Sequence, residues 1–252
     1  MTAPNAVAIV YSDAHYWPGN GRTTAFRGLL AVADAINPSI VIANGDLFDG
    51  AKVTHHAPFG WSKSPGVQAE LTEMIERQAE IVSVAPQAQK FRTVGNHDFR
   101  FDKYLIANAP QFEGLNGTRL ADYLPDWLES WSIRLNDTVI KHRIGSGIHA
   151  AWTNVQKSGV SIVTGHTHKL ECKPFRGYHK QRLWGVETGT LADVGDDVSE
   201  HGDGPFEYAE DGPSHQASGF AVLTWLDGKL LPPEFCEVIE GRAFFRSAVV
   251  AS

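Results

Sequence analysis

Residues 40–49 have the sequence IVIANGDLFD, in which a short apolar run with β-branched residues is followed by glycine and two acidic residues. Such a run is typical of a buried strand, and the polar residues after it indicate a loop. Residues 6–15, AVAIVYSDAH, and residues 91–98, FRTVGNHD, repeat this order. The repetition predicts three strands that each carry polar side chains at their carboxyl ends.

Helical patterns connect these strands. Apolar residues recur at helical spacing over residues 23–36 and 67–84, and Pro38 and Pro86 follow the two segments. Because strand, helix and strand alternate, we expect a central and largely parallel sheet with helices outside it. In such a sheet the loops after the strands line a common crevice, so the polar residues should meet at one edge.

The rest of the chain predicts further helices and a C-terminal third that is rich in strands. We expect the strand pattern of residues 91–94 to be followed by helices over residues 102–108, 120–131 and 148–157. We expect strands over residues 138–142, 161–164, 183–187, 220–225, 229–231 and 235–239. Asp227 and Gly228 form a typical hairpin turn, and the C-terminal strands should build a second sheet.

Length and composition favour a single domain over residues 1–252. A chain of 252 residues with 42% hydrophobic residues can bury a full core. Five tryptophans are expected to lie mostly in this core: Trp127, Trp131, Trp152, Trp184 and Trp225. Residues 194–219 are rich in glycine and aspartate and should form a loop insertion. The cysteines Cys172 and Cys236 are too few for a disulfide framework, which indicates ordinary thiols.

The charge and the N-terminus restrict the class of protein. The formal net charge of -7 argues against binding of nucleic acid through a broad basic surface. A nuclease stays compatible with this charge, because bound divalent ions would make a site locally positive. The apolar run at residues 6–11 is too short for a signal sequence or a membrane span, so we expect a soluble, cytoplasmic protein with no membrane contact.

Four blocks of candidate ligands carry the chemistry. They are residues 13–15 (DAH), 45–49 (GDLFD), 95–98 (GNHD) and 165–168 (GHTH), and each follows a predicted strand. Glycine beside a ligand lets the backbone turn sharply and lets ligands approach a shared centre. These four blocks, in this order, resemble the calcineurin-like, or binuclear, metallophosphoesterase superfamily.

This resemblance implies an α/β fold, a four-layer αββα sandwich of two mixed sheets flanked by helices, with the metal site at the carboxyl ends of strands. It also implies two divalent metal ions and hydrolysis of a phosphate ester by a hydroxide that bridges them. The implied ligands are Asp13, His15 and His168 for one ion, Asn96, His142 and His166 for the other, and Asp46 as the bridge. Carboxylate, amide and imidazole donors suit Mn²⁺, our first expectation, and also Fe, Zn, Ni or Co.

His142 departs from the family pattern, because Arg143 follows it where family members usually have glycine. His149 is the competing candidate for this ligand position. Since His149 lies in a predicted helix and His142 ends a strand pattern, the sequence favours His142.

Two residues are predicted to serve proton transfer. By the same resemblance, His97 protonates the leaving-group oxygen and Asp49 orients the His97 ring; general acid catalysis of this kind contributes about 10²- to 10⁴-fold. The alternative for Asp49 is a cap on the following turn. Asp98 is expected to have such a structural part.

Three further residues are candidates for substrate binding. Arg100 has the planar fork that suits phosphate, and His55 and His56 lie in the loop after the second block. The alternatives are a surface ion pair for Arg100 and solvated positions for the two histidines. His201 and His215, in the insertion, are candidates for covering the site, and a mobile loop is the simpler interpretation.

Two departures narrow the substrate class. The Ser/Thr phosphatases of this superfamily have Arg after the second Asp of the second block and Glu after the Asn-His pair, where this chain has Gly50 and Asp98. The blocks GDLFD and GNHD are instead similar to the DNA-repair nuclease branch, and residues 184–191, WGVETGTL, look like members carried by bacteriophages and prophages.

These similarities favour a phosphodiesterase or nuclease that acts on nucleic acid, in single-stranded regions, or on nucleotides. The alternatives are a phosphomonoesterase of proteins or small molecules, and a non-catalytic metal-binding scaffold. The complete ligand set and His97 count against the scaffold.

Overall fold

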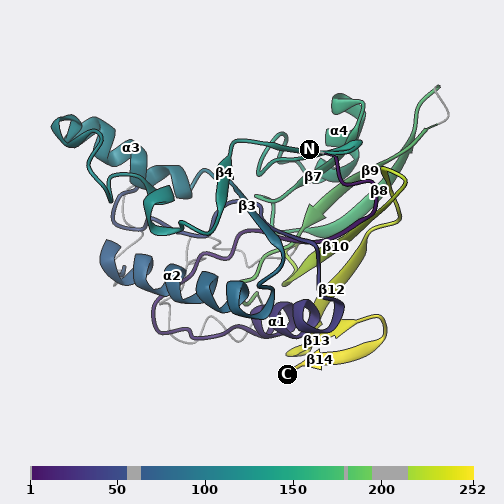
Figure 1. The fold of residues 1–252 in the computed structure, drawn as a ribbon, viewed down its shortest axis with the longest axis horizontal. Coiled ribbons are helices and arrows are strands. Elements are labelled where there is room, and N and C mark those ends of the chain that lie inside the picture. Colours follow the sequence, from purple (N-terminus) through teal and green to yellow (C-terminus); the bar gives the residue numbers. More distant parts are fainter. Residues whose placement is uncertain (1, 56–63, 179–180, 195–214) are drawn as a thin grey trace.

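A computed structural model describes residues 2–55, 64–178, 181–194 and 215–252, which form two stacked sheets with helices outside them (Figure 1). The first sheet contains β1 (Ala6–Tyr11), β2 (Ile40–Ala43), β3 (Gln89–Thr93), β4 (Leu128–Ser130), β10 (Gly219–Leu226), β11 (Lys229–Leu230), β12 (Glu234–Ile239), β13 (Arg242–Phe245) and β14 (Ala248–Ala251). The second sheet contains β5 (Ile133–Leu135), β6 (Thr138–Ile140), β7 (Ser161–Thr164), β8 (Leu170–Arg176) and β9 (Arg182–Thr188). The helices are α1 (Thr24–Ile36), α2 (Val67–Val84), α3 (Asp98–Asn108) and α4 (Ala150–Ser158), with short 3-10 turns at Pro110–Phe112 and Leu120–Tyr123.

The predicted parallel sheet is confirmed in the N-terminal half. Strands β1, β2, β3 and β4 are parallel neighbours, with Ala8 opposite Ile40 and Ile42 opposite Phe91. The carboxyl ends of these strands therefore lie at one edge of the sheet, where the predicted ligand loops begin.

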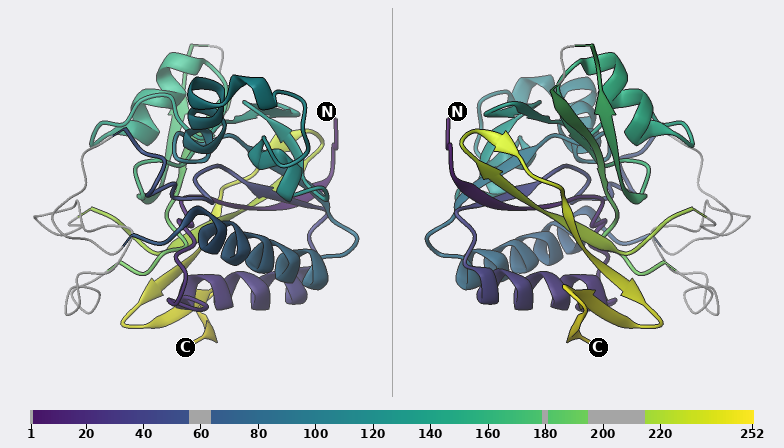
Figure 2. Two further views of the ribbon diagram at one scale, coloured as in Figure 1. Left: turned by 90° about the vertical axis from the view of Figure 1, so that its left-hand side faces the viewer. Right: turned by 90° about the vertical axis from the view of Figure 1, so that its right-hand side faces the viewer.

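Three cores separate four layers, so the predicted sandwich is confirmed (Figure 2). In β1, Ile9 packs into the core beneath α1 and α2, whereas Val10 faces the second sheet. In β7, Val163 faces the first sheet and Ile162 faces α4. Strands whose side chains are apolar on both faces have to be covered on both sides, which produces the order helix, sheet, sheet, helix.

The prediction that the C-terminal strands build the second sheet is wrong for most of them. Strand β10 pairs antiparallel with β1, and β12, β13 and β14 continue the first sheet. Among the strands predicted in the last third, β9 belongs to the second sheet. The reason is that β10 is buried on both faces, as Phe220 and Ala221 show, and a strand of that kind needs a central position in a sheet.

The predicted helix over residues 120–131 is also wrong. This segment contains the 3-10 turn Leu120–Tyr123 and then the strand β4. Pro125 lacks a backbone N–H, and it disfavours the helical conformation of Leu124, whose φ is -128°. Helix α3, in contrast, begins four residues earlier than predicted, at Asp98.

The core contains some of the predicted tryptophans. Trp127, Trp184 and Trp225 are buried, but Trp131 and Trp152 are 57% and 42% exposed, so the prediction is wrong for these two. Each exposed indole packs against a phenylalanine at the surface. The cysteines are free thiols. Among the described segments, no helix combines the length and apolar character that crossing a bilayer requires.

Candidate metal centre

The loops after β1 and β2 are hydrogen-bonded to each other. The backbone N–H of Asp13 donates to the carbonyl of Gly45 at 2.9 Å, and that of His15 donates to the carbonyl of Asp46 at 3.0 Å. These bonds continue the β1–β2 pairing beyond the strands, so candidate ligands from two distant motifs lie side by side.

Five candidate ligands have a left-handed backbone. They are Asp13 (φ 53°), His15 (φ 40°), Asp46 (φ 55°), His166 (φ 71°) and His168 (φ 58°). Such a conformation costs about 1–3 kcal/mol at a non-glycine residue and persists where the surroundings impose it. Strain gathered on these residues indicates a functional site.

Two glycines allow the ligand loops to meet. A Cβ atom at Gly95 would lie 2.0 Å from Oδ1 of Asp46, and one at Gly165 would lie 2.6 Å from Oδ2 of Asp13. Any side chain at either position would collide with a candidate ligand. The glycines of the motif blocks are therefore required by close approach.

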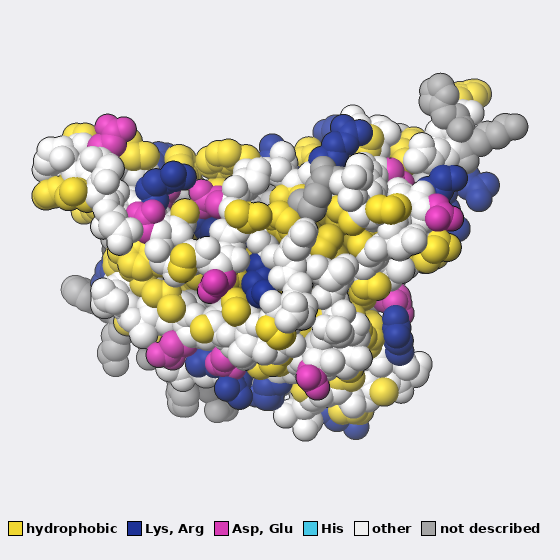
Figure 3. Space-filling view, viewed as in Figure 1, with side chains coloured by type: hydrophobic (Ala, Val, Ile, Leu, Met, Phe, Trp, Pro, Cys, Tyr) yellow, Lys and Arg dark blue, Asp and Glu magenta, His cyan; other side chains and the backbone are white. Residues whose placement is uncertain are grey.

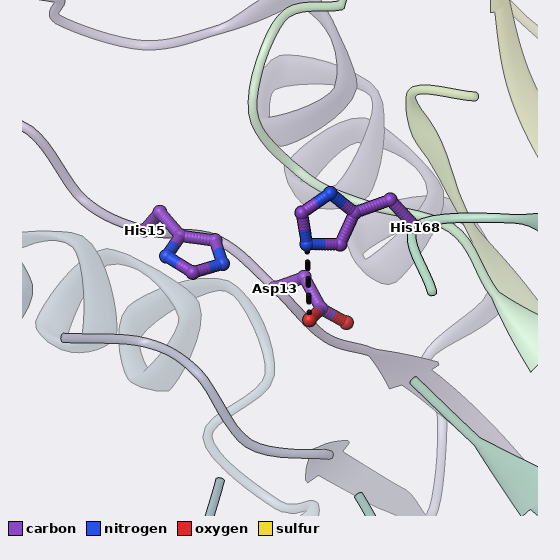
Figure 4. Close-up of side chains that lie close together, drawn as sticks. All are labelled: Asp13, His15 and His168. Atoms are coloured by element: carbon purple, nitrogen blue, oxygen red, sulfur yellow. Dashed lines mark ion pairs between the residues drawn. The ribbon is translucent and has the colours of Figure 1, made fainter. Parts of the chain in front are cut away.

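The Asp13 cluster consists of Asp13, His15 and His168, whose ligand atoms lie within 4.8 Å of one another (Figure 4). All three residues are buried, and Nε2 of His168 lies 3.3 Å from Oδ1 of Asp13. Nδ1 of His15 lies 2.9 Å from Oδ1 of Asp49, and Nδ1 of His168 lies 3.1 Å from Oε1 of Gln216. Both imidazoles thus donate through Nδ1, which leaves Nε2 as the atom for a metal.

The Asp46 cluster consists of Asp46, His142 and His166, again within 4.8 Å. Nε2 of His142 lies 3.0 Å from Oδ2 of Asp46, while its Nδ1 donates to the carbonyl of Asn44 at 2.8 Å. Oδ1 of Asn96 is buried and accepts no hydrogen bond from a described residue. A buried amide oxygen beside this carboxylate and these imidazoles fits a divalent cation.

The charges of the clusters also favour a cation. Burial alone would raise the pKa of Asp46, but His142 holds it well below its usual value. Burial would lower the pKa of His142, yet Asp46 and Asp13 raise it to about 10. Burial and the charge of His142 lower the pKa of His166 to about 4. The carboxylates of Asp46 and Asp13, one from each cluster, both stabilise the positive charge of the His142 imidazole. Positive charge is therefore favoured where the two clusters adjoin.

Asp98 has the structural part expected of it. Its carboxylate accepts the backbone N–H groups of Asp46, Leu47, Phe48 and Gly95 at 2.9 to 3.1 Å. It is buried, and a guanidinium nitrogen of Arg92 lies 3.7 Å away. One carboxylate therefore holds the second and third motif blocks together.

Asp49 joins His15 to His97. Its Oδ1 lies 2.9 Å from Nδ1 of His15 and 3.0 Å from Nδ1 of His97, and the two rings are 4.6 Å apart between centroids. Arg100 donates to the carbonyl of Asp49 at 2.8 Å and lies 3.1 Å from Nε2 of His97. Arg100 is thus held against His97, and the alternative given for it, a surface ion pair, is absent from the described residues.

The candidate substrate-binding residues and the competing ligand candidate His149 lie in different parts of the structure. His55 and Arg100 line one cleft together with Asn96 and His142. His149 is exposed and belongs to neither cluster; it precedes α4, which corrects the prediction that it lies in a helix.

Parts of the predicted insertion cannot be compared with the structure. His56, His201 and residues 195–214 lie outside the described residues. His215 is exposed. The hypothesis that His201 and His215 cover the site therefore stays untested, as does the simpler interpretation of a mobile loop.

Two supporting residues had no signal in the sequence. Gln216 orients His168 from within the predicted insertion. Glu187 is buried and accepts hydrogen bonds from the hydroxyls of Thr164, at 2.9 Å, and Thr167, which supports the loop that carries His166 and His168. Glu187 lies in the stretch 184–191 that resembles phage members, but nothing in that stretch indicated a supporting role, and no spacing connects Gln216 to a motif block.

Two bacteriophage proteins are similar to this chain over most of its length. The Gene 54 protein of Mycobacterium phage D29 is 26% identical over 234 residues, which cover 81% of this chain and 84% of that protein. The Gene 54 protein of Mycobacterium phage L5 is 25% identical over 234 residues with the same coverage. These similarities agree with the predicted resemblance to phage members.

Two solved structures that match this chain have low sequence identity to it and TM-scores below 0.5. Vacuolar protein sorting 29 from Cryptosporidium parvum is 12% identical with a TM-score of 0.49, over 99% of this chain and 100% of that one. The nuclease MPE of Pseudomonas putida is 16% identical with a TM-score of 0.31, over 89% of this chain and 86% of that one.

The family is shown by the sequence between β1 and the loop after β7. Residues 7–168 match the model of the calcineurin-like phosphoesterase family. This range contains all four motif blocks and both candidate ligand clusters. The chain belongs to the calcineurin-like phosphoesterase family and is a metal-dependent hydrolase of phosphate esters.

Proposed function

We propose that this enzyme is a binuclear phosphodiesterase that acts on nucleic acid or nucleotides. The observation that carries the proposal is the pair of adjoining clusters, each with one carboxylate and two imidazoles. In the proposed assignment, one ion is held by the Asp13 cluster and the other by Asn96, His142 and His166. Asp46 bridges them, which is supported by its electrostatic interaction with His15 as well as with His142.

The donor set suits Mn²⁺ best, and also Fe, Zn, Ni or Co. Bound divalent ions would supply an activated water and positive charge for the phosphoryl oxygens. The chain's own ligands set the charge of the site, because Asp13 and Asp46 together with a hydroxide would leave about +1 from two divalent ions. Gly50 stands where protein phosphatases have Arg. A metal centre with a net charge of about +1 suits a monoanionic scissile diester better than a dianionic monoester.

His97 is the proposed proton donor. Burial would lower its pKa, but the hydrogen bond to Asp49 and the charge of Asp46 raise it above its usual value. The Nδ1–H group is directed to Asp49, so Nε2 is the atom that would deliver a proton to the leaving oxygen. Arg100 donates to this Nε2 in the structure, and protonation of His97 has to break that hydrogen bond.

The proposal is tested by metal analysis and paired substrates. The purified protein should bind two divalent ions per chain, and with Mn²⁺ it should hydrolyse a bis-aryl phosphodiester at least as efficiently as the matching aryl monoester. It should also cleave single-stranded DNA or RNA. A strong preference for the monoester, without cleavage of any oligonucleotide or cyclic nucleotide, would identify a phosphomonoesterase instead. Two bound ions without hydrolysis of any ester would identify a scaffold.

Proton donation by His97 has its own test. His97→Ala should retain its metal ions and should slow esters with poor leaving groups by about 10³-fold, but activated aryl esters far less. An activated leaving group departs without a proton, which is the physical reason for the difference. An equal loss on both kinds of ester would contradict the acid role and would assign His97 to positioning of the phosphate.

A further inference from the structure

A cleft of about 510 Å³ opens onto the Asp46 cluster, since Asn96 and His142 form part of its wall. Its volume lies within the range of roughly 300–1,000 Å³ that small-ligand sites occupy. The other walls come from the first turns of α3, from the residue after β4 and from the end of β6. A molecule that fills this cleft therefore lies against the proposed metal site.

The charge of the cleft differs from that of the protein. Its lining includes Arg100, Lys103, Lys141 and Arg143 and, among the residues that the structure describes, no acidic residue, although the chain as a whole has a net charge of -7. Lys103, Lys141 and Arg143 form no ion pair with a described residue. On the face drawn in Figure 3, acidic and basic side chains are interspersed. The cleft is thus suited to a ligand with negative charges beyond the one at the metals.

The cleft also has an aromatic wall. Trp131 is 57% exposed, and its ring packs edge to face on Phe99, with 5.3 Å between the ring centroids and 71° between the planes. Phe99 directly follows Asp98, which holds the motif loops, so Trp131 rests on the same rigid support as the candidate ligands. A large exposed indole in a basic groove is the arrangement that stacks on an unpaired base while cations contact the backbone.

The geometry points to a nucleotide subsite in this cleft, in which the nucleoside next to the scissile phosphate stacks on Trp131 and adjacent phosphates lie against Lys103, Lys141 and Arg143. This inference rests on the proposed phosphodiesterase function and names its substrate class as unpaired nucleic acid. A stacked base in a duplex does not expose its face to an indole, so paired regions should be excluded.

Two phosphodiesters with one leaving group test the subsite. Methyl p-nitrophenyl phosphate and p-nitrophenyl thymidine phosphate, with the ester on either sugar hydroxyl, share the scissile bond and differ in the nucleoside. The wild-type enzyme should have the higher kcat/KM for at least one thymidine ester. Trp131→Ala should lower that value by roughly 5- to 100-fold and change the methyl ester by less than about twofold, because base stacking alone is lost. Trp131→Phe should restore part of the preference.

Trp152 provides the matched control. It is 42% exposed and packs edge to face on Phe175, at 5.5 Å between centroids, but it lies on α4 outside the cleft. Trp152→Ala should leave the preference for the thymidine ester unchanged. An equal effect of Trp131→Ala and Trp152→Ala would overturn the subsite.

The cations are tested on a short thymidine oligonucleotide. Lys103→Gln and Arg143→Gln should each lower kcat/KM and reduce the dependence of log(kcat/KM) on log[salt] by about 0.7 for each phosphate that the protein no longer neutralises. Lys157→Gln, on α4, is the control and should change neither quantity. An equal effect of the control would overturn the assignment of the phosphates to these cations.

The outcomes separate the subsite from the proposed function. Hydrolysis of both diesters by the wild type, with no preference for thymidine or with a preference that survives Trp131→Ala, overturns the subsite and leaves the phosphodiesterase standing. Hydrolysis of neither diester, with full activity on an aryl monoester, overturns the phosphodiesterase and the subsite with it.

Discussion

The Asp13 and Asp46 clusters share one ligand chemistry but are supported differently. In the Asp13 cluster all three residues are buried, and side chains orient the imidazoles: Asp49 for His15 and Gln216 for His168. In the Asp46 cluster a backbone carbonyl, that of Asn44, orients His142, and His166 is only partly buried.

Because of this difference, the two candidate metal sites should depend on single supporting side chains to different extents. Orientation by a backbone carbonyl depends on the fold and survives changes of side chain, whereas orientation by Asp49 or Gln216 depends on single residues. The Asp46 cluster opens onto the cleft, whereas all three residues of the Asp13 cluster are buried and His15 lines a separate, smaller pocket. We therefore expect substitutions of the supporting side chains to affect the ion of the Asp13 cluster and to leave the ion at the cleft in place.

Asp46→Ala should weaken both metal sites alike and should have the largest effect on kcat of the substitutions considered. If Asp46 bridges the ions, its removal weakens both sites and lowers kcat by about 10⁴-fold or more, because the activated water is lost. Metal content per chain and kcat with excess Mn²⁺ are the measurements. Full activity, or one ion in the wild type without a second under excess metal, would refute the binuclear assignment.

Glu70→Gln tests the support beneath Asp49 through the pH dependence of stability. Glu70 is buried and accepts the N–H of Gly50 at 2.7 Å, and burial raises its pKa from 4.5 to about 7. Because the folded state binds this proton more tightly, the stabilisation is complete below pH 4.5 and is lost as the pH rises through about 7. Its full size is at most about 3 kcal/mol.

The measurement is urea unfolding of the wild type and Glu70→Gln at about pH 5 and about pH 8. The wild type should lose more stability between these pH values than the variant does. Glu76→Gln is the control, since Glu76 is exposed on the same helix. Parallel losses in the wild type and in Glu70→Gln would contradict the raised pKa.

Asp49→Asn should weaken the Asp13 cluster selectively. The change removes the carboxylate that orients His15 and His97, so we expect a 10- to 100-fold loss of affinity for one of two ions and a lower kcat. Calorimetric titration with Mn²⁺ resolves the two sites. Asp102→Asn is the matched control, because Asp102 accepts the N–H of Leu120 away from the centre. Equal weakening of both ions would remove the proposed difference between the clusters.

Gln216→Ala should have the smallest effect. His168 keeps its position beside Asp13 but loses the acceptor for Nδ1, so affinity for the ion of the Asp13 cluster should fall by about tenfold. Gln216→Glu keeps an acceptor at this position and should restore the affinity in the same titration. A loss at the ion held by the Asp46 cluster would reverse the proposed roles of the clusters.

Local sequence patterns predicted the helices and strands whose conformation depends mainly on residues close by in the sequence. The bounds of β1, β2, β7 and α2 are those expected from apolar runs and from helical spacing. The motif blocks were found for the same reason, since each ligand lies within a few residues of a strand end and a glycine. The residue assignment to individual ions stays a prediction.

The sequence by itself therefore determined the alternation of strands and helices, the family and the residue types of the metal centre. Only the tertiary structure decided that β10 lies beside β1 and that Gln216 supports His168. It also decided that a single oxygen of Asp49, Oδ1, contacts both His15 and His97. The physical reason is distance along the chain: periodicity reports which face of an element is buried, but not which of several apolar partners will cover it. Strand pairing and ligand support are settled when segments far apart in sequence pack together, and these interactions leave no spacing that a single sequence can reveal.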